Sequence, residues 1–203
     1  MSIVDELYLK IDEGKAGQNQ GLKTGFPKLD WYTGGFQKGI YKLWYGQSGA
    51  GKSSVVVYSE IYRIFRDYPD AKVLQIYFSL EMSSSVLLAK LLSLYLEDEF
   101  GIEISYMDLM SVRKPIPEDI YTKVLDARSW LDSISKKLII FDKQLNADSF
   151  YAAMKEILKQ HGQFTIAPDG RKEIYTPNDS ELIINIILDH LGLVSPAKGR
   201  SKK

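Results

Sequence analysis

Residues 46–53 restrict the possible folds of this chain more than any other segment. They read Gly-Gln-Ser-Gly-Ala-Gly-Lys-Ser, which matches G-x-x-x-x-G-K-[ST], the pattern of a phosphate-binding P-loop. Such a loop joins the end of a β-strand to the start of an α-helix, and its glycines let backbone N–H groups converge on phosphate oxygens. The chain is therefore expected to form a strand before Gly46 and a helix after Gly51.

The sequence on both sides of the loop has the required patterns. The run Tyr41–Gly46 is short, aromatic and apolar, which predicts a strand that ends at the loop. After the loop, the valine triplet 55–57 favours a strand locally, but a longer helical periodicity outweighs it. The apolar residues on this helical face are Val57, Ile61, Ile64 and Phe65. The P-loop thus has a predicted strand before it and a predicted helix after it.

Strands and helices alternate along the rest of the chain. Strands are predicted at 72–80, 137–142 and 181–189, with a hairpin over 164–175 whose turn is Pro168, Asp169 and Gly170. Helices are predicted at 3–11, 83–95 and 117–134, and a further helix runs to Leu158 from a cap at Asn146 or Asp148. This order predicts an α/β fold with a mostly parallel sheet flanked by helices and a small β-hairpin. In such sheets, ligands bind beyond the carboxyl ends of the strands.

The composition excludes several classes of protein. The 26 lysines and arginines balance 26 aspartates and glutamates, so a strongly basic nucleic-acid binder is not indicated. The absence of cysteine excludes disulfides and thiolate zinc sites, and it is consistent with the reducing cytoplasm. No apolar stretch approaches the ~20 residues of a membrane span, and the acidic N-terminus does not resemble a signal peptide. We expect a cytoplasmic protein without a membrane partner.

The P-loop residues have defined chemical roles. Lys52 is expected to reach the β- and γ-phosphates, and the Ser53 hydroxyl is expected to bind Mg²⁺. The helix N-terminus adds partial positive charge toward the phosphates. The predicted nucleotide-binding residues are Gly46, Gln47, Ser48, Gly49, Ala50, Gly51, Lys52, Ser53 and Ser54.

A P-loop enzyme also needs a carboxylate near its Mg²⁺, usually at the end of an apolar strand. Asp189 ends the run 183–188, and Asp142 ends the run 138–141. Either one is also compatible with a polar residue that simply marks where a strand leaves the sheet. Asp189 is favoured because its strand has the more continuously apolar sequence, which is typical of a buried parallel strand.

Hydrolysis requires a further carboxylate that orients or deprotonates the attacking water. Glu81 follows the predicted strand 72–80, so it belongs to the same edge of the sheet as the end of the P-loop strand. From its position alone, a solvated or helix-capping glutamate is an equally good interpretation.

Three segments together resemble the ATPase domain of the replicative, hexameric DnaB-like helicases, a branch of the RecA-like ATPases. The first is Thr24–Asp30 with Thr33–Gly39, which is similar to the motif that precedes the P-loop in this family. The second, Phe78–Met82, is similar to the segment that presents the catalytic glutamate, and the third, Ile187–Leu193, is similar to the Walker B strand and the turn after it. The resemblance runs from about Leu22 to the C-terminus.

The resemblance implies a RecA-like core over 22–203, preceded by an amphipathic helix and linker over 1–21. It implies ATP and Mg²⁺ as cofactors, Glu81 and Lys52 as catalytic residues, and Ser53 with Asp189 as Mg²⁺ ligands. It also implies a homo-oligomeric ring, a hexamer, that moves on single-stranded DNA during replication and unwinds duplex DNA. The helix over 3–11 then docks on a neighbouring subunit, and a primase or helicase loader is a candidate partner.

The sequence departs from the family pattern in one respect that keeps alternatives open. In the family, the DNA-binding loops, the γ-phosphate sensor and the arginine finger follow the Walker B strand, so the resemblance implies a phage-type core that is incomplete at its C-terminus and weakly active or inactive by itself. One alternative is a RecA- or KaiC-like ATPase that binds DNA or protein without unwinding. Another is a nucleotide-binding assembly module without catalytic turnover.

Overall fold

The structure is a computed structural model that describes residues 2–143, 145–167, 170, 173–190, 192 and 194. The chain forms two compact units. Unit 1 comprises Met1–Ala71 and Ala89–Arg128, and unit 2 comprises Lys72–Leu88 and Ser129–Lys203. The two units are described separately below.

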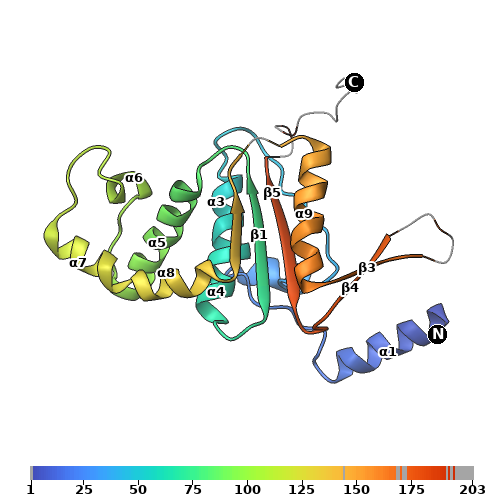
Figure 1. Cartoon of the computed structure of the whole chain (residues 1–203). Helices are drawn as coiled ribbons and strands as arrows, with labels where there is room; N and C mark the ends of the chain where they lie inside the picture. Colours follow the sequence, from blue (N-terminus) through green and yellow to red (C-terminus); the bar gives the residue numbers. More distant parts are fainter. Residues whose placement is uncertain are drawn as a thin grey trace. The chain divides into compact units, whose positions relative to one another are not determined.

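Unit 2 contains a three-stranded parallel sheet in the order β2-β1-β5 (Figure 1). Its strands are β1 (Val73–Ser79), β2 (Leu138–Phe141) and β5 (Ile183–Asp189). All seven residues of the central strand β1 are buried. The three strands predicted at these positions are therefore confirmed, and so is their parallel arrangement.

The apolar face of β1 packs against helix α9 (Ala147–His161). Leu74, Ile76 and Phe78 point to this face because every second side chain of a strand lies on the same side, and they form a buried cluster with Ile157. Asn146 begins α9 with a reciprocal capping box to Ser149, so Asn146 rather than Asp148 is the cap. Figure 1 shows α9 lying along the strands.

The predicted hairpin is also present in unit 2. Strands β3 (Gly162–Ile166) and β4 (Glu173–Pro177) pair antiparallel. Glu173 accepts hydrogen bonds from Tyr151 and Lys155 of α9, at 2.7 and 2.5 Å. The predicted turn residues Pro168 and Asp169 lie outside the described residues. Unit 2 also holds the first residues of α5 (Ser84–Phe100) and nearly all of α8 (Arg128–Ser135).

Unit 1 is built around the helix that follows the P-loop. Segments α3 (Lys52–Val56), η1 (Val57–Tyr62) and α4 (Arg63–Asp67) run as one continuous helix, of which η1 is a π-helical turn. The predicted apolar face is confirmed, since Val57, Ile61, Ile64 and Phe65 are all buried. Salt bridges from Arg63 to Asp98 and from Arg66 to Glu99 join this helix to α5.

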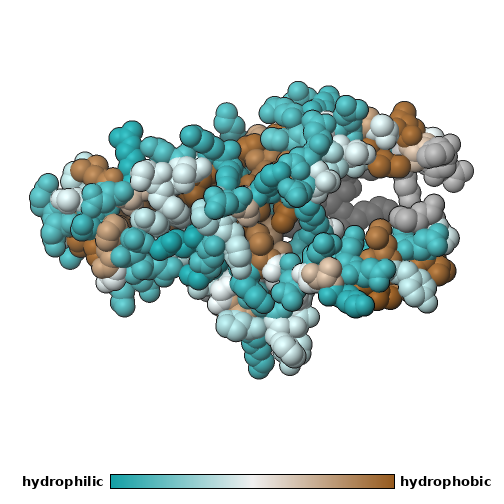
Figure 2. All heavy atoms as spheres, turned by 90° about the horizontal axis from the view of Figure 1, so that it is seen from below, coloured by the Kyte–Doolittle hydropathy of each residue, from teal (hydrophilic) through white to brown (hydrophobic). Residues whose placement is uncertain are grey.

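Helix α1 (Ile3–Lys15) stands in the same unit and has no buried residue. Apolar side chains lie exposed among polar ones on the molecular surface (Figure 2), and on α1 these are Ile3, Val4, Leu7, Tyr8, Leu9 and Ile11. Two shorter helices, α6 (Tyr106–Leu109) and α7 (Glu118–Asp126), complete unit 1 together with α2 (Pro27–Thr33). Among the helices described, none is long and apolar enough to cross a membrane.

Two predicted elements are wrong. The predicted strand Tyr41–Gly46 is extended but belongs to neither sheet, because a strand needs a hydrogen-bonding neighbour and none of the described residues provides one. The predicted single helix over 117–134 is two helices, α7 and α8, which meet at the buried Ala127. There the backbone ψ of −9° leaves the helical path.

Candidate functional site

The P-loop has the backbone conformation that its glycines were expected to allow. Gly49 and Gly51 have φ angles of 77° and 81°, in the left-handed region that side-chain-bearing residues rarely adopt. A Cβ atom at either position would meet no heavy atom within 4 Å. Helix α3 begins at Lys52, directly after this turn. The loop is therefore open on its outer side, which leaves room for a phosphate group.

Lys52 closes the loop from within. Its Nζ donates hydrogen bonds to the carbonyl oxygens of Gly46 and Gln47, at 3.1 and 2.9 Å. The side chains of Lys52 and Ser53 are half-buried at the helix N-terminus, and residues 46–51 are exposed. A mobile ammonium group, a hydroxyl group and free N–H groups at a helix start are the groups that bind phosphate and Mg²⁺. The residues present thus fit a nucleoside triphosphate with its metal ion.

The motif that precedes the P-loop supports the helix behind it. The backbone N–H and the hydroxyl of Thr24 both donate to the carboxylate of Asp30, at 3.0 and 2.7 Å, and both residues are buried. A Cβ at Gly25 would lie 2.8 Å from the Arg63 side chain and 3.0 Å from the Tyr58 ring, so only glycine lets this turn approach the helix so closely. This motif therefore has a structural role in unit 1.

Replacing Asp30 with alanine should destabilise the protein by about 3 kcal/mol, because two buried donors of Thr24 would lose their acceptor. The measurement is the free energy of unfolding from a denaturant titration. Asp12→Ala on the exposed face of α1 is the matched control and should change it by less than about 0.5 kcal/mol. An equally small change in the Asp30 variant would show that the buried contact is dispensable.

Unit 2 brings Asp189 and Glu81 to the same edge of its sheet. Asp189 is the last residue of β5 and pairs in register with Ser79, the last residue of β1. The Leu80 N–H donates to the Asp189 carbonyl oxygen at 2.6 Å, and Glu81 is the next residue and is exposed. Parallel strands thus place the two predicted carboxylates at neighbouring carboxyl ends, as the α/β arrangement requires.

Sequence reasoning missed the residue that holds the Asp189 carboxylate. The Tyr77 hydroxyl donates to Asp189 Oδ2 at 2.7 Å, and the ring of Tyr77 is buried. Burial, then the hydrogen bond and charge of Asp189, with a smaller contribution from the charge of Glu81, raise the pKa of Tyr77. The hydroxyl is therefore a neutral donor at physiological pH, and it orients one oxygen of the carboxylate.

The signal for this contact was present in the sequence. Gln75, Tyr77 and Ser79 alternate with the apolar residues of β1, so they share one face of the sheet. On that face Gln75 accepts a hydrogen bond from Asn185 of β5 at 2.8 Å. Buried polar side chains that alternate along a strand predict partners on a neighbouring strand.

Asp142, the other candidate for a metal ligand, caps a helix. Its Oδ2 accepts hydrogen bonds from the backbone N–H and the hydroxyl of Ser84, at 3.0 and 2.7 Å, at the start of α5. These bonds hold the pKa of the Asp142 carboxyl below its usual range. The reason for preferring Asp189 was wrong, however, because β5 is only half-buried and its Ile186 is exposed. The hydrogen bonding of Asp142 is the better argument.

Among the described residues, no three His, Asp or Glu side chains gather into a group that could hold a metal ion without other ligands. Mg²⁺ at phosphate-transfer sites is commonly bound through one or two protein ligands and the substrate phosphates. A hydroxyl group and a single carboxylate are consistent with that mode of binding.

Comparison with known proteins identifies the family. The model described as the DnaB-like helicase C terminal domain matches residues 21–167. The solved ATPase domain of a phage helicase is similar to this chain with a TM-score of 0.69 and 18% sequence identity, over 99% of this chain and 61% of that chain. The chain thus spans about three-fifths of the length of that relative and shares its α/β fold. No curated protein matches the chain.

Proposed function

The chain belongs to the family of DnaB-like helicase C-terminal domains, and from this premise we propose that it binds ATP with Mg²⁺ and hydrolyses it. We further propose that hydrolysis drives movement along single-stranded DNA and the unwinding of duplex DNA. The observation that carries the proposal is the P-loop itself, whose left-handed glycines leave its outer side open while Lys52 and Ser53 lie at the start of the following helix.

Each candidate residue has a proposed role. Lys52 and the N–H groups of residues 46–54 bind the phosphates. Ser53 and Asp189 bind Mg²⁺, which lowers the charge on the phosphate oxygens when it is present. Glu81 accepts a proton from the attacking water, and its exposure at the end of β1 leaves it accessible to solvent. Tyr77 keeps the Asp189 carboxylate in one orientation through its hydrogen bond.

The proposed partners are other copies of this chain in a ring, single-stranded DNA, and a primase or helicase loader. The surface of α1 supports the first of these. Six apolar side chains are exposed on this helix and none is buried, which is unusual for a helix without a partner. We propose that α1 docks on a neighbouring subunit of the ring.

Asp189→Asn should remove most of the dependence of ATP affinity on Mg²⁺, because the amide loses the negative charge that the metal ion prefers in a ligand. Asp142→Asn should leave this dependence intact and should instead lower the melting temperature, because it weakens the cap of α5. The measurement is the affinity for a slowly hydrolysed ATP analogue with Mg²⁺ and with EDTA. The opposite ranking of the two variants would assign the metal ion to Asp142.

The assay for turnover separates the remaining alternatives. Phosphate release that depends on Lys52 and Glu81 supports an ATPase. Tight binding of ATP-Mg²⁺ without any phosphate release, with single-stranded DNA present, would favour the assembly module. Phosphate release without strand separation of a forked DNA would favour the ATPase that does not unwind.

A further inference from the structure

We propose that a buried ion pair between Lys42 and Glu60 clamps the two flanks of the P-loop and keeps the loop in its nucleotide-binding shape. The inference deepens the proposed function and rests on it. All of the residues concerned belong to unit 1.

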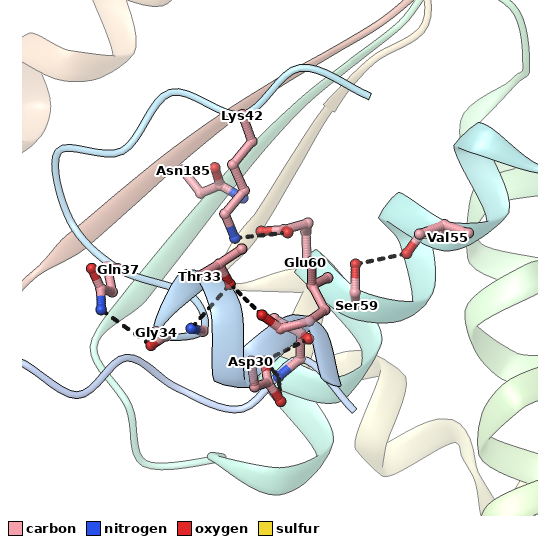
Figure 3. A network of polar contacts seen from close by, with 12 residues as sticks. Asp30, Thr33, Gly34, Gln37, Lys42, Val55, Ser59, Glu60 and Asn185 are labelled. Carbon is pink, nitrogen blue, oxygen red and sulfur yellow. Dashed lines mark hydrogen bonds and ion pairs between the residues drawn. The ribbon is translucent and has the colours of Figure 1, made fainter. Parts of the chain in front are cut away.

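The pair joins the chain before the P-loop to the chain after it. Lys42 lies in the extended segment 41–46 that leads into Gly46, and Glu60 lies in the helix that begins at Lys52. Lys42 Nζ is 3.0 Å from Glu60 Oε1, and the exposed fractions of the two side chains are 22% and 6%. Figure 3 shows the lysine reaching from the extended segment to the glutamate on the helix. The ammonium group also lies 5.6 Å from the centre of the Phe36 ring.

Hydrogen bonds of a sheet do not hold the segment 41–46. Within the described part of the chain, it belongs to no strand and makes no backbone–backbone hydrogen bond. Its odd-numbered side chains point to solvent, and Tyr41, Leu43 and Tyr45 are 84%, 64% and 90% exposed. Lys42 and Trp44 lie on the opposite, half-buried side. The Lys42 side chain is therefore the main polar tether of this flank.

The π-helical turn η1 explains how a glutamate comes to face the interior. A π-turn contains an additional residue and shifts the register of the helix faces. Five of the six residues of η1 are buried, and Glu60 is among them, between Ser59 and Ile61. The Ser59 hydroxyl donates to the Val55 carbonyl oxygen at 2.8 Å and so satisfies a backbone acceptor in this turn. π-turns inside helices are frequent at functional sites.

Stability alone is a weak reason to bury this pair. Removing one partner of a buried ion pair is strongly destabilising, but replacing both with apolar residues of similar size is often neutral or stabilising. Buried charges serve best where they fix a register. Here the pair determines which residue of the flank lies against the helix, and hence where Gly46 begins the loop.

This reasoning separates a positioning role from a structural one. Lys42→Met should lower the melting temperature, since it leaves Glu60 buried without the ammonium group, and should also weaken nucleotide binding. In the double variant Lys42→Met/Glu60→Leu, the melting temperature should recover, whereas affinity for a fluorescent ATP analogue should stay about tenfold below that of the parent. The loop then spends only a minor fraction of time in the binding shape, and affinity falls in proportion.

Lys42→Arg, which keeps the charge, should retain most of the affinity. Lys123→Met is the control, because it removes an exposed ion pair with Asp126 on α7 and should change neither quantity. Parent-like nucleotide affinity in the stable double variant would overturn the proposed clamp.

Hydrogen exchange of the free protein tests the clamp without nucleotide. Backbone amides of 47–53 should exchange faster in the double variant than in the parent, while those of β1 should not change. Unchanged exchange at 47–53 would refute the clamp. If the parent does not bind nucleotide but the exchange rises as expected, the proposed function fails and the clamp of the loop stands.

Discussion

Lys52→Ala should lower the affinity for ATP-Mg²⁺ by roughly a hundredfold or more, which removes measurable binding at micromolar nucleotide. The substitution deletes the charge that faces the β- and γ-phosphates, and hydrogen bonds to charged groups are the strongest that a protein makes. The same ammonium group bonds to the carbonyl oxygens of Gly46 and Gln47 in the free loop. The measurement is titration with a fluorescent ATP analogue.

Circular dichroism has to show that the Lys52 variant remains folded. Lys10→Ala on the exposed helix α1 removes the same charge from unit 1 and should leave the affinity unchanged. A folded Lys52 variant that binds the analogue as well as the parent does would disprove the assignment of the P-loop as the nucleotide site.

Glu81→Gln should preserve nucleotide binding but slow hydrolysis by on the order of a hundredfold or more. The amide has nearly the size of the carboxylate but lacks the basicity needed to accept a proton from water. Steady-state phosphate release in the presence of single-stranded DNA measures the rate, and the ATP-bound form should accumulate because it is stalled before cleavage.

The control is Glu103→Gln, a chemically identical change at an exposed position, which should leave both binding and hydrolysis intact. Hydrolysis in the Glu81 variant at the parental rate would require another base. Weakened binding without a change in rate would instead indicate that Glu81 takes part in holding the nucleotide.

The sequence was most informative where local pattern and topology agree. The P-loop pattern requires left-handed glycines before a helix, and Gly49 and Gly51 have that conformation. Alternating strands and helices require a parallel sheet, and a parallel sheet brings Glu81 and Asp189 to one edge. Neither inference needs a contact between distant side chains.

Distant contacts account for what the sequence could not reveal. The segment 41–46 has the composition of a strand, but composition does not state whether a neighbouring strand is available to pair with it. Asp142 and its partner Ser84 are 58 positions apart, so the capping role of Asp142 could not be distinguished from metal binding. The π-turn was invisible because a periodicity of 3.6 residues cannot register one additional residue, and Glu60 was therefore not identified as buried.

The order in which β1 and β5 pair has a consequence for biosynthesis. The P-loop and its helix form a local unit that can fold while the chain is still emerging from the ribosome. Tyr77 and Asp189, by contrast, are 112 positions apart, and the closure of so long a loop has to precede any stabilising contact between them. Until β5 has been synthesised and added to the sheet, one side of β1 lacks its neighbour, and this exposed edge is the part of the nascent chain most in need of a chaperone.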